Sequence, residues 1–221
     1  MTPPEAAAPV WRLVTVDIDG TLTTVHGWRV IADAFGRTAE FSATQRRFFA
    51  HEEGEDEHLR SMLAIAAGHR LAEVEAVLEA TPRIQGIAEG VRSLQGRGSK
   101  VALLTHNPRF VCEWYARKFG FDDFEGCGGS EVVDGVVQPP ADVRADKPAG
   151  LRALLERHSL RTTDVVHIGD GRADAALFSV VDRGVALNSS DPGVERAADL
   201  ALHSNDFRAV AAAIEDLRPR T

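Results

Sequence analysis

Residues 14–23 of this 221-residue chain read VTVDIDGTLT. The apolar and β-branched start of the stretch predicts a buried strand, and Gly20 marks a turn directly after Asp17 and Asp19. Both carboxylates then lie at the carboxyl edge of a sheet, where open α/β sheets bind their ligands. Two acids this close resist ionising together unless a cation lies between them, and oxygen ligands suit Mg²⁺. The stretch therefore indicates a Mg²⁺ site, with a solvated Asp-Gly turn as the plainer alternative.

The composition is that of an ordinary globular protein, with 44% hydrophobic and 26% charged residues. The formal net charge of −8 argues against a nucleic-acid partner. Two cysteines are too few for a disulfide framework or a zinc cluster, and they favour a cytoplasmic location. Residues 1–9 are rich in Ala and Pro without a basic start or a long apolar run, which predicts a flexible tail and no membrane partner.

The chain divides into two patterns. Residues 24–81 repeat apolar side chains at spacings of three and four, which is typical of roughly four short helices. From residue 86 onward, helical patterns alternate with buried strands, and Asn107 is the expected N-cap of one of the helices. The predicted strands cover residues 100–105, 164–169, 184–188 and 199–202, the predicted helices cover residues 87–95, 108–119, 148–158 and 207–217, and an Asp-Gly hairpin covers residues 131–138.

This order predicts an α/β fold. The right-handed crossover rule gives a Rossmann-like parallel sheet wrapped by helices on both faces, with a small helical cap inserted after the first strand. The expected core domain comprises residues 10–23 and 85–221, and the expected cap domain comprises residues 24–84.

Four sets of polar side chains share a place at or near the ends of the predicted strands, and a sheet gathers such ends at one edge. The sets are Asp17 with Asp19, then Thr105, then Lys147, and last Asp170 with Asp174. Together they supply an acidic pair, a hydroxyl donor, a fixed cation and a second acidic pair, which is what phosphoryl transfer requires.

The same residues carry a resemblance to a known family. The order DIDGT (17–21), LLTHN (103–107), DKP (146–148) and GDGRAD (169–174) resembles the four motifs of the haloacid dehalogenase superfamily of aspartyl phosphotransferases. The similarity runs from residue 12 to the last helix. It is greatest to the phosphoserine phosphatase-like branch, whose small helical cap follows the first motif.

The resemblance implies a role for each matching residue. Asp17 is the expected nucleophile, forming an aspartyl phosphate, and Asp19 is the expected acid and then base. Mg²⁺ is expected on Asp17, on the backbone carbonyl of Asp19 and on Asp170. Thr105 and Lys147 are expected to hold the phosphoryl oxygens. Asp174 is expected to support the metal or to orient Lys147.

The resemblance also implies substrate contacts at Gly20, His106 and Asn107, although many phosphoserine phosphatases have a Gly-Gly pair where this chain has His106-Asn107. Arg60 matches the carboxylate-binding arginine of that branch. His26 stands where the branch places the acid that binds the substrate amino group, which puts phosphoserine itself in doubt.

The expected activity is therefore Mg²⁺-dependent hydrolysis of a small phosphorylated metabolite, phosphoserine or a related phosphorylated acid, by a monomer or homodimer. A phosphomutase or phosphotransferase of the same superfamily is an open alternative, because phosphate on Asp17 can pass to a second hydroxyl instead of water. A receiver-like signalling module is a further alternative. Receiver modules lack the DxD pair, the late GDGxxD motif and the helical insertion that this chain has, which argues against this alternative.

Overall fold

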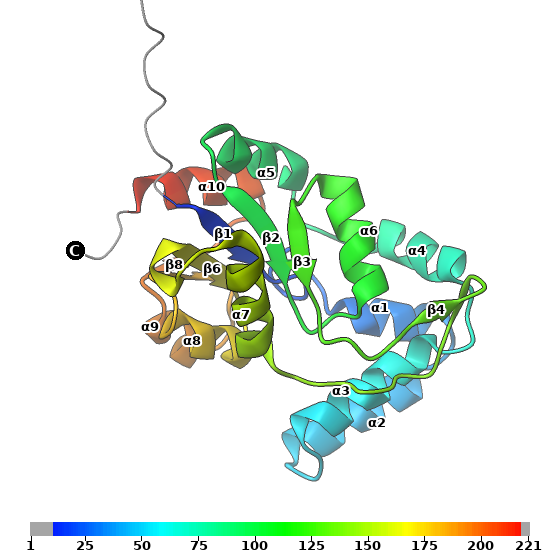
Figure 1. Ribbon diagram of the computed structural model, residues 1–221. Coiled ribbons are helices and arrows are strands. Elements are labelled where there is room, and N and C mark those ends of the chain that lie inside the picture. Colours follow the sequence, from blue (N-terminus) through cyan, green and yellow to red (C-terminus); the bar gives the residue numbers. More distant parts are fainter. Residues whose placement is uncertain (1–10, 218–221) are drawn as a thin grey trace, which may run out of the picture.

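The computed structural model describes residues 11–217, so the predicted tail at residues 1–9 lies outside the described residues. Its centre is a sheet of six parallel strands in the order β3-β2-β1-β6-β7-β8 (Figure 1). The strands are β1 (Leu13–Val16), β2 (Lys100–Leu104), β3 (Asp123–Glu125), β6 (Val165–Gly169), β7 (Arg183–Leu187) and β8 (Leu200–Leu202). The first strand, β1, therefore lies inside the sheet, between β2 and β6.

Helices cover both faces of the sheet because its strands are apolar on both sides. On β1, Val14 and Val16 belong to one buried apolar cluster, and Leu13 belongs to another on the opposite face. The first face carries α5 (Ile87–Gly96), α6 (Arg109–Phe119) and α10 (Phe207–Asp216), and the second carries α7 (Lys147–His158), α8 (Arg172–Phe178) and α9 (Pro192–Ala197) (Figure 1). The predicted α/β fold is confirmed.

A group of helices, here called the helical layer, comes between β1 and α5. It comprises α1 (Gly27–Ala34), α2 (Thr38–Phe49), α3 (Glu55–Leu63), the short 3₁₀ turn η1 (Ala64–Ala66) and α4 (Leu71–Ala80). The chain enters and leaves the layer side by side, since Thr23 forms an antiparallel bridge with Arg83 and the Thr24 amide donates to the Pro82 carbonyl at 3.1 Å. The layer is thus attached to the sheet through two adjacent segments.

A hairpin from the second half of the chain also contacts the helical layer. Its strands are β4 (Val132–Val133) and β5 (Val136–Val137), joined by Asp134 and Gly135 with φ of 50° and 76°, the geometry that favours an Asp-Gly turn. The amide of Leu71 donates to the Gly135 carbonyl at 2.8 Å. The hairpin that the sequence predicts therefore contacts the helical layer, although it belongs to the second half of the chain.

Two of the sequence predictions need correction. The edge strand β3 was not predicted, and its sequence, Asp-Phe-Glu, explains why: both acids pair with Arg157 of α7 instead of facing an apolar layer. The helix α6 begins at Arg109 with Pro108 as its N-cap residue, so Asn107 is not the cap. A second 3₁₀ turn, η2 (Thr162–Asp164), precedes β6.

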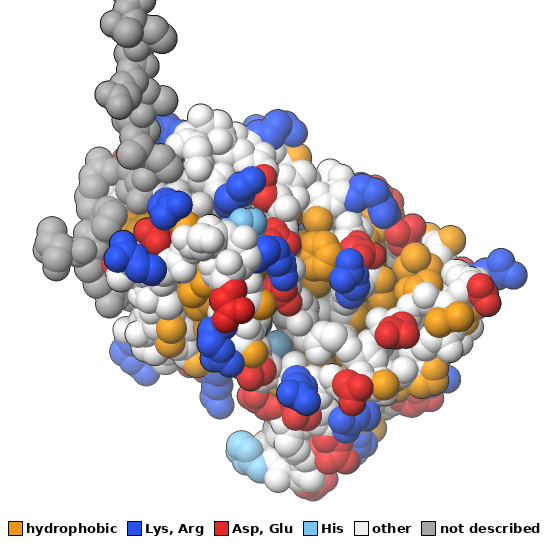
Figure 2. Space-filling model, in the orientation of Figure 1, with side chains coloured by type: hydrophobic (Ala, Val, Ile, Leu, Met, Phe, Trp, Pro, Cys, Tyr) orange, Lys and Arg blue, Asp and Glu red, His pale blue; other side chains and the backbone are white. Residues whose placement is uncertain are grey.

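Acidic and basic side chains are interspersed over the face drawn in Figure 2, with no large area of one sign. This face therefore offers no broad positive area to attract an anionic ligand. In the range 11–217, no helix has both the length and the apolar character needed to cross a lipid bilayer.

Candidate active site

Asp17 follows β1 directly and lies at the carboxyl edge of the sheet. Its amide donates to the Ile168 carbonyl of the neighbouring strand at 2.9 Å, and its side chain is buried. Three residues later the chain turns at Gly20, with φ of 81°. A Cβ atom there would lie 2.2 Å from Asp170 Oδ2, so only glycine lets the turn approach this carboxylate.

Lys147 joins the acids of two motifs. It is the first residue of α7, whose N-cap Asp146 accepts a hydrogen bond from the Ala149 amide. Its ammonium lies 3.1 Å from Asp17 Oδ1 and 2.5 Å from Asp174 Oδ1. Burial disfavours the charge, but the two carboxylates outweigh it and raise the pKa of Lys147 above its ordinary value. Lys147 is therefore a fixed cation inside the fold.

A buried histidine, His167, contacts the carboxylate of Asp174. His167 Nε2 lies 2.9 Å from Asp174 Oδ1, and His167 Nδ1 lies 2.8 Å from Thr15 Oγ1 on β1. The Gly171 amide donates to the other oxygen, Asp174 Oδ2, at 2.9 Å. Burial opposes ionisation of Asp174, but Lys147 and His167 outweigh it and hold its pKa below the ordinary range. Asp174 thus forms a buried ion pair with Lys147.

A divalent cation fits beside these residues. Asp17, Asp170 and Asp174 each offer a carboxylate oxygen within 4.8 Å of the others. Burial raises the pKa of Asp170 to about 6, although Thr21 Oγ1 donates to it at 2.8 Å, and burial with the neighbouring acids raises the pKa of Asp17. Carboxylates that resist ionisation together are the ligands that a hard cation stabilises, so the donor set suits Mg²⁺.

Asp19 is held by two donors. The Gly27 amide, at the start of α1, donates to Asp19 Oδ1 at 2.7 Å, and Asn107 Nδ2 donates to Asp19 Oδ2 at 2.8 Å. A Cβ atom on Gly27 would lie 2.6 Å from Asp19 Oδ1, so the small residue permits this contact. Asp19 is partly exposed, unlike Asp17. Part of Asp19 is therefore accessible to a ligand or to water.

Asn107 links three parts of the site. Besides Asp19, its Nδ2 donates to Thr105 Oγ1 at 3.0 Å, and its Oδ1 accepts from Trp28 Nε1 at 3.0 Å. These contacts use the side chain that the sequence assigned to capping α6. Thr105 lies at the end of β2 and is buried, with its hydroxyl oxygen accepting from Asn107. The Thr105 hydroxyl therefore keeps its own proton for another acceptor.

His106 lies between these two residues with a buried nitrogen. Its Nε2 has no hydrogen-bond partner among the described residues. Burial, with the nearby Lys147, lowers the pKa of His106 to about 4. His106 is therefore neutral at physiological pH and offers a hydrogen-bonding group rather than a charge.

The two residues predicted from the helical layer lie apart from this buried group. His26 precedes α1, is exposed, and has its ring edge-on to Phe41 at 5.3 Å. Arg60 is exposed on α3. Its helical neighbours on the same face are Asp56, which accepts from the Ala145 amide at 2.7 Å, and Leu63, which lies beside Gly129. Arg60 thus shares the α3 face that contacts the core.

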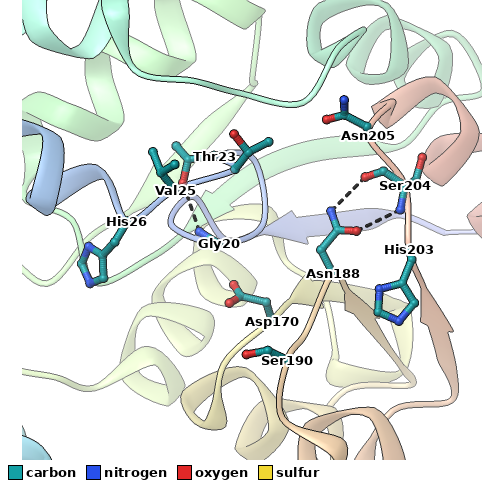
Figure 3. Close-up of a pocket in the computed structure, with 11 residues that line it drawn as sticks. Gly20, Thr23, Val25, His26, Asp170, Asn188, Ser190, His203, Ser204 and Asn205 are labelled. Carbon is teal, nitrogen blue, oxygen red and sulfur yellow. Dashed lines mark hydrogen bonds between the residues drawn. The ribbon is translucent and has the colours of Figure 1, made fainter.

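A pocket of about 560 Å³ opens between His26 and the ends of β7 and β8, with Asp170 in its wall (Figure 3). The remaining lining includes polar side chains from three segments: Thr23, Thr24, Asn188, Ser190, His203, Ser204 and Asn205. Asn188 is fixed by two hydrogen bonds to the Ser204 backbone, at 2.8 and 2.9 Å. Asp170 is the one carboxylate in this lining.

The sequence matches a family with this arrangement. Residues 11–182 fit the family model described as haloacid dehalogenase-like hydrolase. The chain belongs to this family. Phosphoserine phosphatase SerB2 of Mycobacterium tuberculosis is 26% identical over 196 residues, which cover 86% of this chain and 47% of that protein. The chain thus spans about half the length of this relative.

Solved structures share the fold of this chain. A family hydrolase of Salmonella enterica superposes with a TM-score of 0.82 and 18% identity over 92% of this chain and 71% of that one. A phospho-aspartyl intermediate analogue of phosphoserine phosphatase superposes with a TM-score of 0.75 and 20% identity over 92% and 98%. The predicted resemblance to this superfamily and its phosphoserine phosphatase-like branch is confirmed.

Some residues of this group were not predicted from the sequence. His167 gave one signal, a lone histidine inside the apolar run VVHIG, and Thr21 belongs to the DIDGT motif itself. Trp28 gave none, because its contact with Asn107 joins residues 79 positions apart.

Proposed function

We propose that this haloacid dehalogenase-like hydrolase is a Mg²⁺-dependent phosphomonoester hydrolase that works through a phosphorylated Asp17. The observation that carries the proposal is the placement of Lys147, within 3.1 Å of Asp17 and 2.5 Å of Asp174, beside the carboxylate of Asp170. A buried nucleophile, a fixed cation and a cation-binding acid cluster form one group at the carboxyl edge.

In the first step, the Asp17 carboxylate attacks phosphorus and the bond to the leaving alcohol breaks. Lys147 and the Thr105 hydroxyl hold phosphoryl oxygens, so the negative charge that opposes attack by a carboxylate is offset. Asp19 gives its proton to the leaving alcohol. The products of this step are the free alcohol and phospho-Asp17.

In the second step, Asp19 removes a proton from water, which attacks phosphorus and releases inorganic phosphate. Asp17 returns to its carboxylate and Asp19 to its protonated form. Asp17, Asp170 and the backbone carbonyl of Asp19 would hold Mg²⁺, with Asp174 beside the first two. When bound, the ion neutralises the acids and withdraws charge from the phosphoryl group.

For the substrate, we propose a small phosphomonoester that carries an acid or hydroxyl group rather than an amino group. Arg60 is exposed on the same side of α3 as Asp56 and has no ion-pair partner among residues 11–217, and a guanidinium binds a carboxylate in bidentate fashion. His26 cannot replace a carboxylate as partner of an ammonium. The pocket beside it is lined mainly by hydroxyl and amide groups, and its one carboxylate, Asp170, is a proposed metal ligand. We also propose that residues 24–84 act as the cap over this substrate.

The proposal is tested by measuring phosphate release from a panel of phosphomonoesters after exhaustive chelation and after Mg²⁺ is restored. The panel includes phosphoserine, its hydroxy-acid analogue without the amine, a polyol phosphate and an activated aryl phosphate. We expect no turnover after chelation, full recovery with Mg²⁺ and a preference for the analogue over phosphoserine. Full activity after chelation would contradict the proposed Mg²⁺ dependence. A strong preference for phosphoserine would contradict the proposed class of substrate.

A further inference from the structure

The proposed acid and base, Asp19, is held through a chain of side chains that begins in the helical layer. Trp28 Nε1 of α1 donates to Asn107 Oδ1 at 3.0 Å, and Asn107 Nδ2 donates to Asp19 Oδ2 at 2.8 Å. Trp28 is 2% exposed and Asn107 is 4% exposed, so water does not compete for these contacts.

The chemistry of the indole fixes which way the Asn107 amide points. An indole N–H can only donate, so it must face the amide oxygen of Asn107. The amide NH₂ group then faces Asp19 and Thr105, and an ionised carboxylate can only accept. Each group in the chain therefore has the one orientation that satisfies all of its neighbours.

The chain also leaves room for proton transfer. Asp19 Oδ2 uses one lone pair for Asn107, and Asp19 Oδ1 uses one for the Gly27 amide at 2.7 Å. An ionised carboxylate has about four acceptor positions, so the remaining ones can reach the leaving oxygen or a water molecule. Two donors thus fix the plane of the carboxylate without consuming its capacity to carry a proton.

We propose that Trp28 and Asn107 are positioning residues that hold the Asp19 carboxylate in line with the leaving oxygen, and that Trp28 makes this alignment depend on the placement of α1. The inference rests on the proposed function. A misaligned acid lowers the rate of proton transfer without weakening the hold on the phosphoryl group. The effect belongs in kcat, and it is largest when the leaving group needs a proton.

The first variant is Asn107→Leu, which keeps the approximate volume of the side chain and removes both the amide oxygen and the amide NH₂ group. With an alkyl phosphate we expect kcat to fall about 10- to 100-fold, the loss that follows removal of a hydrogen bond to a charged group, with KM little changed. Formation of phospho-Asp17 from an activated aryl phosphate, followed in a single turnover, should fall much less because that leaving group needs no proton. An equal loss for both substrates overturns the proposal.

The second variant, Trp28→Phe, keeps a ring in the core and removes only the indole donor. Without that donor the Asn107 amide can reverse and present its oxygen to Asp19, so we expect a smaller loss of the same kind, about 3- to 10-fold in kcat. Trp11→Phe is the matched control, because Trp11 Nε1 also donates inside the protein, to the Ile214 carbonyl at 3.1 Å. The control should lower thermal stability and keep the wild-type ratio of alkyl to aryl rates.

Asn107 also contacts Thr105, so a loss could come from poorer binding of the phosphoryl group. Inhibition by inorganic phosphate separates the two effects: its inhibition constant should stay within about 3-fold of wild type in Asn107→Leu if the loss is in proton transfer. A large weakening of phosphate inhibition in step with kcat overturns the proposal in favour of a role for Asn107 in phosphate binding.

The deciding experiment is a double-mutant cycle with Asp19→Asn. If Asn107 acts through Asp19, then Asn107→Leu should change kcat less than about 3-fold in the Asp19→Asn background, although it costs 10- to 100-fold in wild type. Equal losses in both backgrounds overturn this inference and leave the proposed function standing. A wild-type protein that releases no phosphate from any phosphomonoester with Mg²⁺ overturns both.

Discussion

Lys147 and Arg60 are two cations with opposite surroundings. Lys147, at the carboxyl edge of the sheet, is 4% exposed and lies against two carboxylates. Arg60, on the helical layer, is exposed and has no ion pair among the described residues. Without a ligand, Lys147 at the sheet edge is already held by two carboxylates, whereas the guanidinium of Arg60 on the helical layer keeps its hydrogen-bond donors available. From this difference we expect changes at the sheet edge to affect turnover of every substrate, and a change at Arg60 to affect the choice between substrates.

The comparison predicts the largest effect at the centre of the sheet edge. Asp17→Asn keeps the shape of the side chain and removes the attacking carboxylate, so we expect kcat to fall by about 10⁴-fold or more for every substrate. Phosphate release by the purified variant measures this, with circular dichroism to confirm folding. Turnover near that of the wild type would place the nucleophile elsewhere.

The next largest effect is expected at Asp19, which lies where the edge meets the layer. Asp19→Asn removes proton transfer but keeps two hydrogen-bonding atoms, so kcat for an alkyl phosphate should fall about 10²- to 10⁴-fold. The loss should be smaller for formation of the phosphorylated enzyme from an activated aryl phosphate. Rates that fall equally for all leaving groups would assign Asp19 another role.

A moderate effect, confined to substrate choice, is expected on the layer. Arg60→Ala should raise KM for a phosphomonoester carrying a carboxylate about 10-fold or more, since a charged hydrogen-bonded contact is lost, and should leave kcat for an aryl phosphate within about 2-fold. Steady-state kinetics on both substrates measures the difference. A fall in kcat for both would show that Arg60 contributes to the chemistry as well as to substrate choice.

The smallest effect concerns stability at the sheet edge. Burial and Lys147 hold the pKa of His106 at about 4, below its ordinary 6.5. Below about pH 6.5 the unfolded chain protonates this histidine and the folded chain does not, so the contribution of His106 to the free energy of unfolding falls as pH drops, by about 1.4 kcal/mol per unit at most. The raised pKa values of Asp17 and Asp170 act in the opposite direction. Above about pH 6.5 His106 is neutral in the folded and the unfolded chain, so its full contribution to the free energy of unfolding is present.

Denaturant unfolding between pH 7 and 5 measures this slope. On acidification His106→Asn should lose less stability than the wild type, and the difference between the two isolates His106 because His167, His58 and the acids are present in both proteins. Identical slopes for the wild type and the variant would contradict this assignment of His106.

The same contrast explains what could be predicted from the sequence. Asp17, Asp170 and Thr105 follow apolar strands directly, and a parallel sheet gathers such ends whatever the loops between them do. Their convergence therefore follows from local patterns. The contacts of His167 with Thr15 and of Trp28 with Asn107 depend on the register of strands and on helix placement, which no local pattern specifies.

The helical layer shows the limit most clearly. Apolar spacing predicted its helices, but the side-by-side entry and exit near Thr23 and Arg83 come from contacts 60 positions apart. The strand β3 was missed for a related reason, since its acids are satisfied by Arg157 from a later helix. Pairing partners decide such segments, and the partners lie elsewhere in the chain.

The central claim is that Asp17 carries the phosphoryl group between two half-reactions. The direct measurement is rapid acid quenching of the enzyme during turnover of a radiolabelled phosphomonoester with Mg²⁺, followed by peptide mapping of the protein-bound label. We predict an alkali-labile phosphate on Asp17 that forms and decays at rates compatible with turnover, and its absence in Asp17→Asn. Label on another residue, or rapid phosphate release with no label on the protein at any time, would contradict the account.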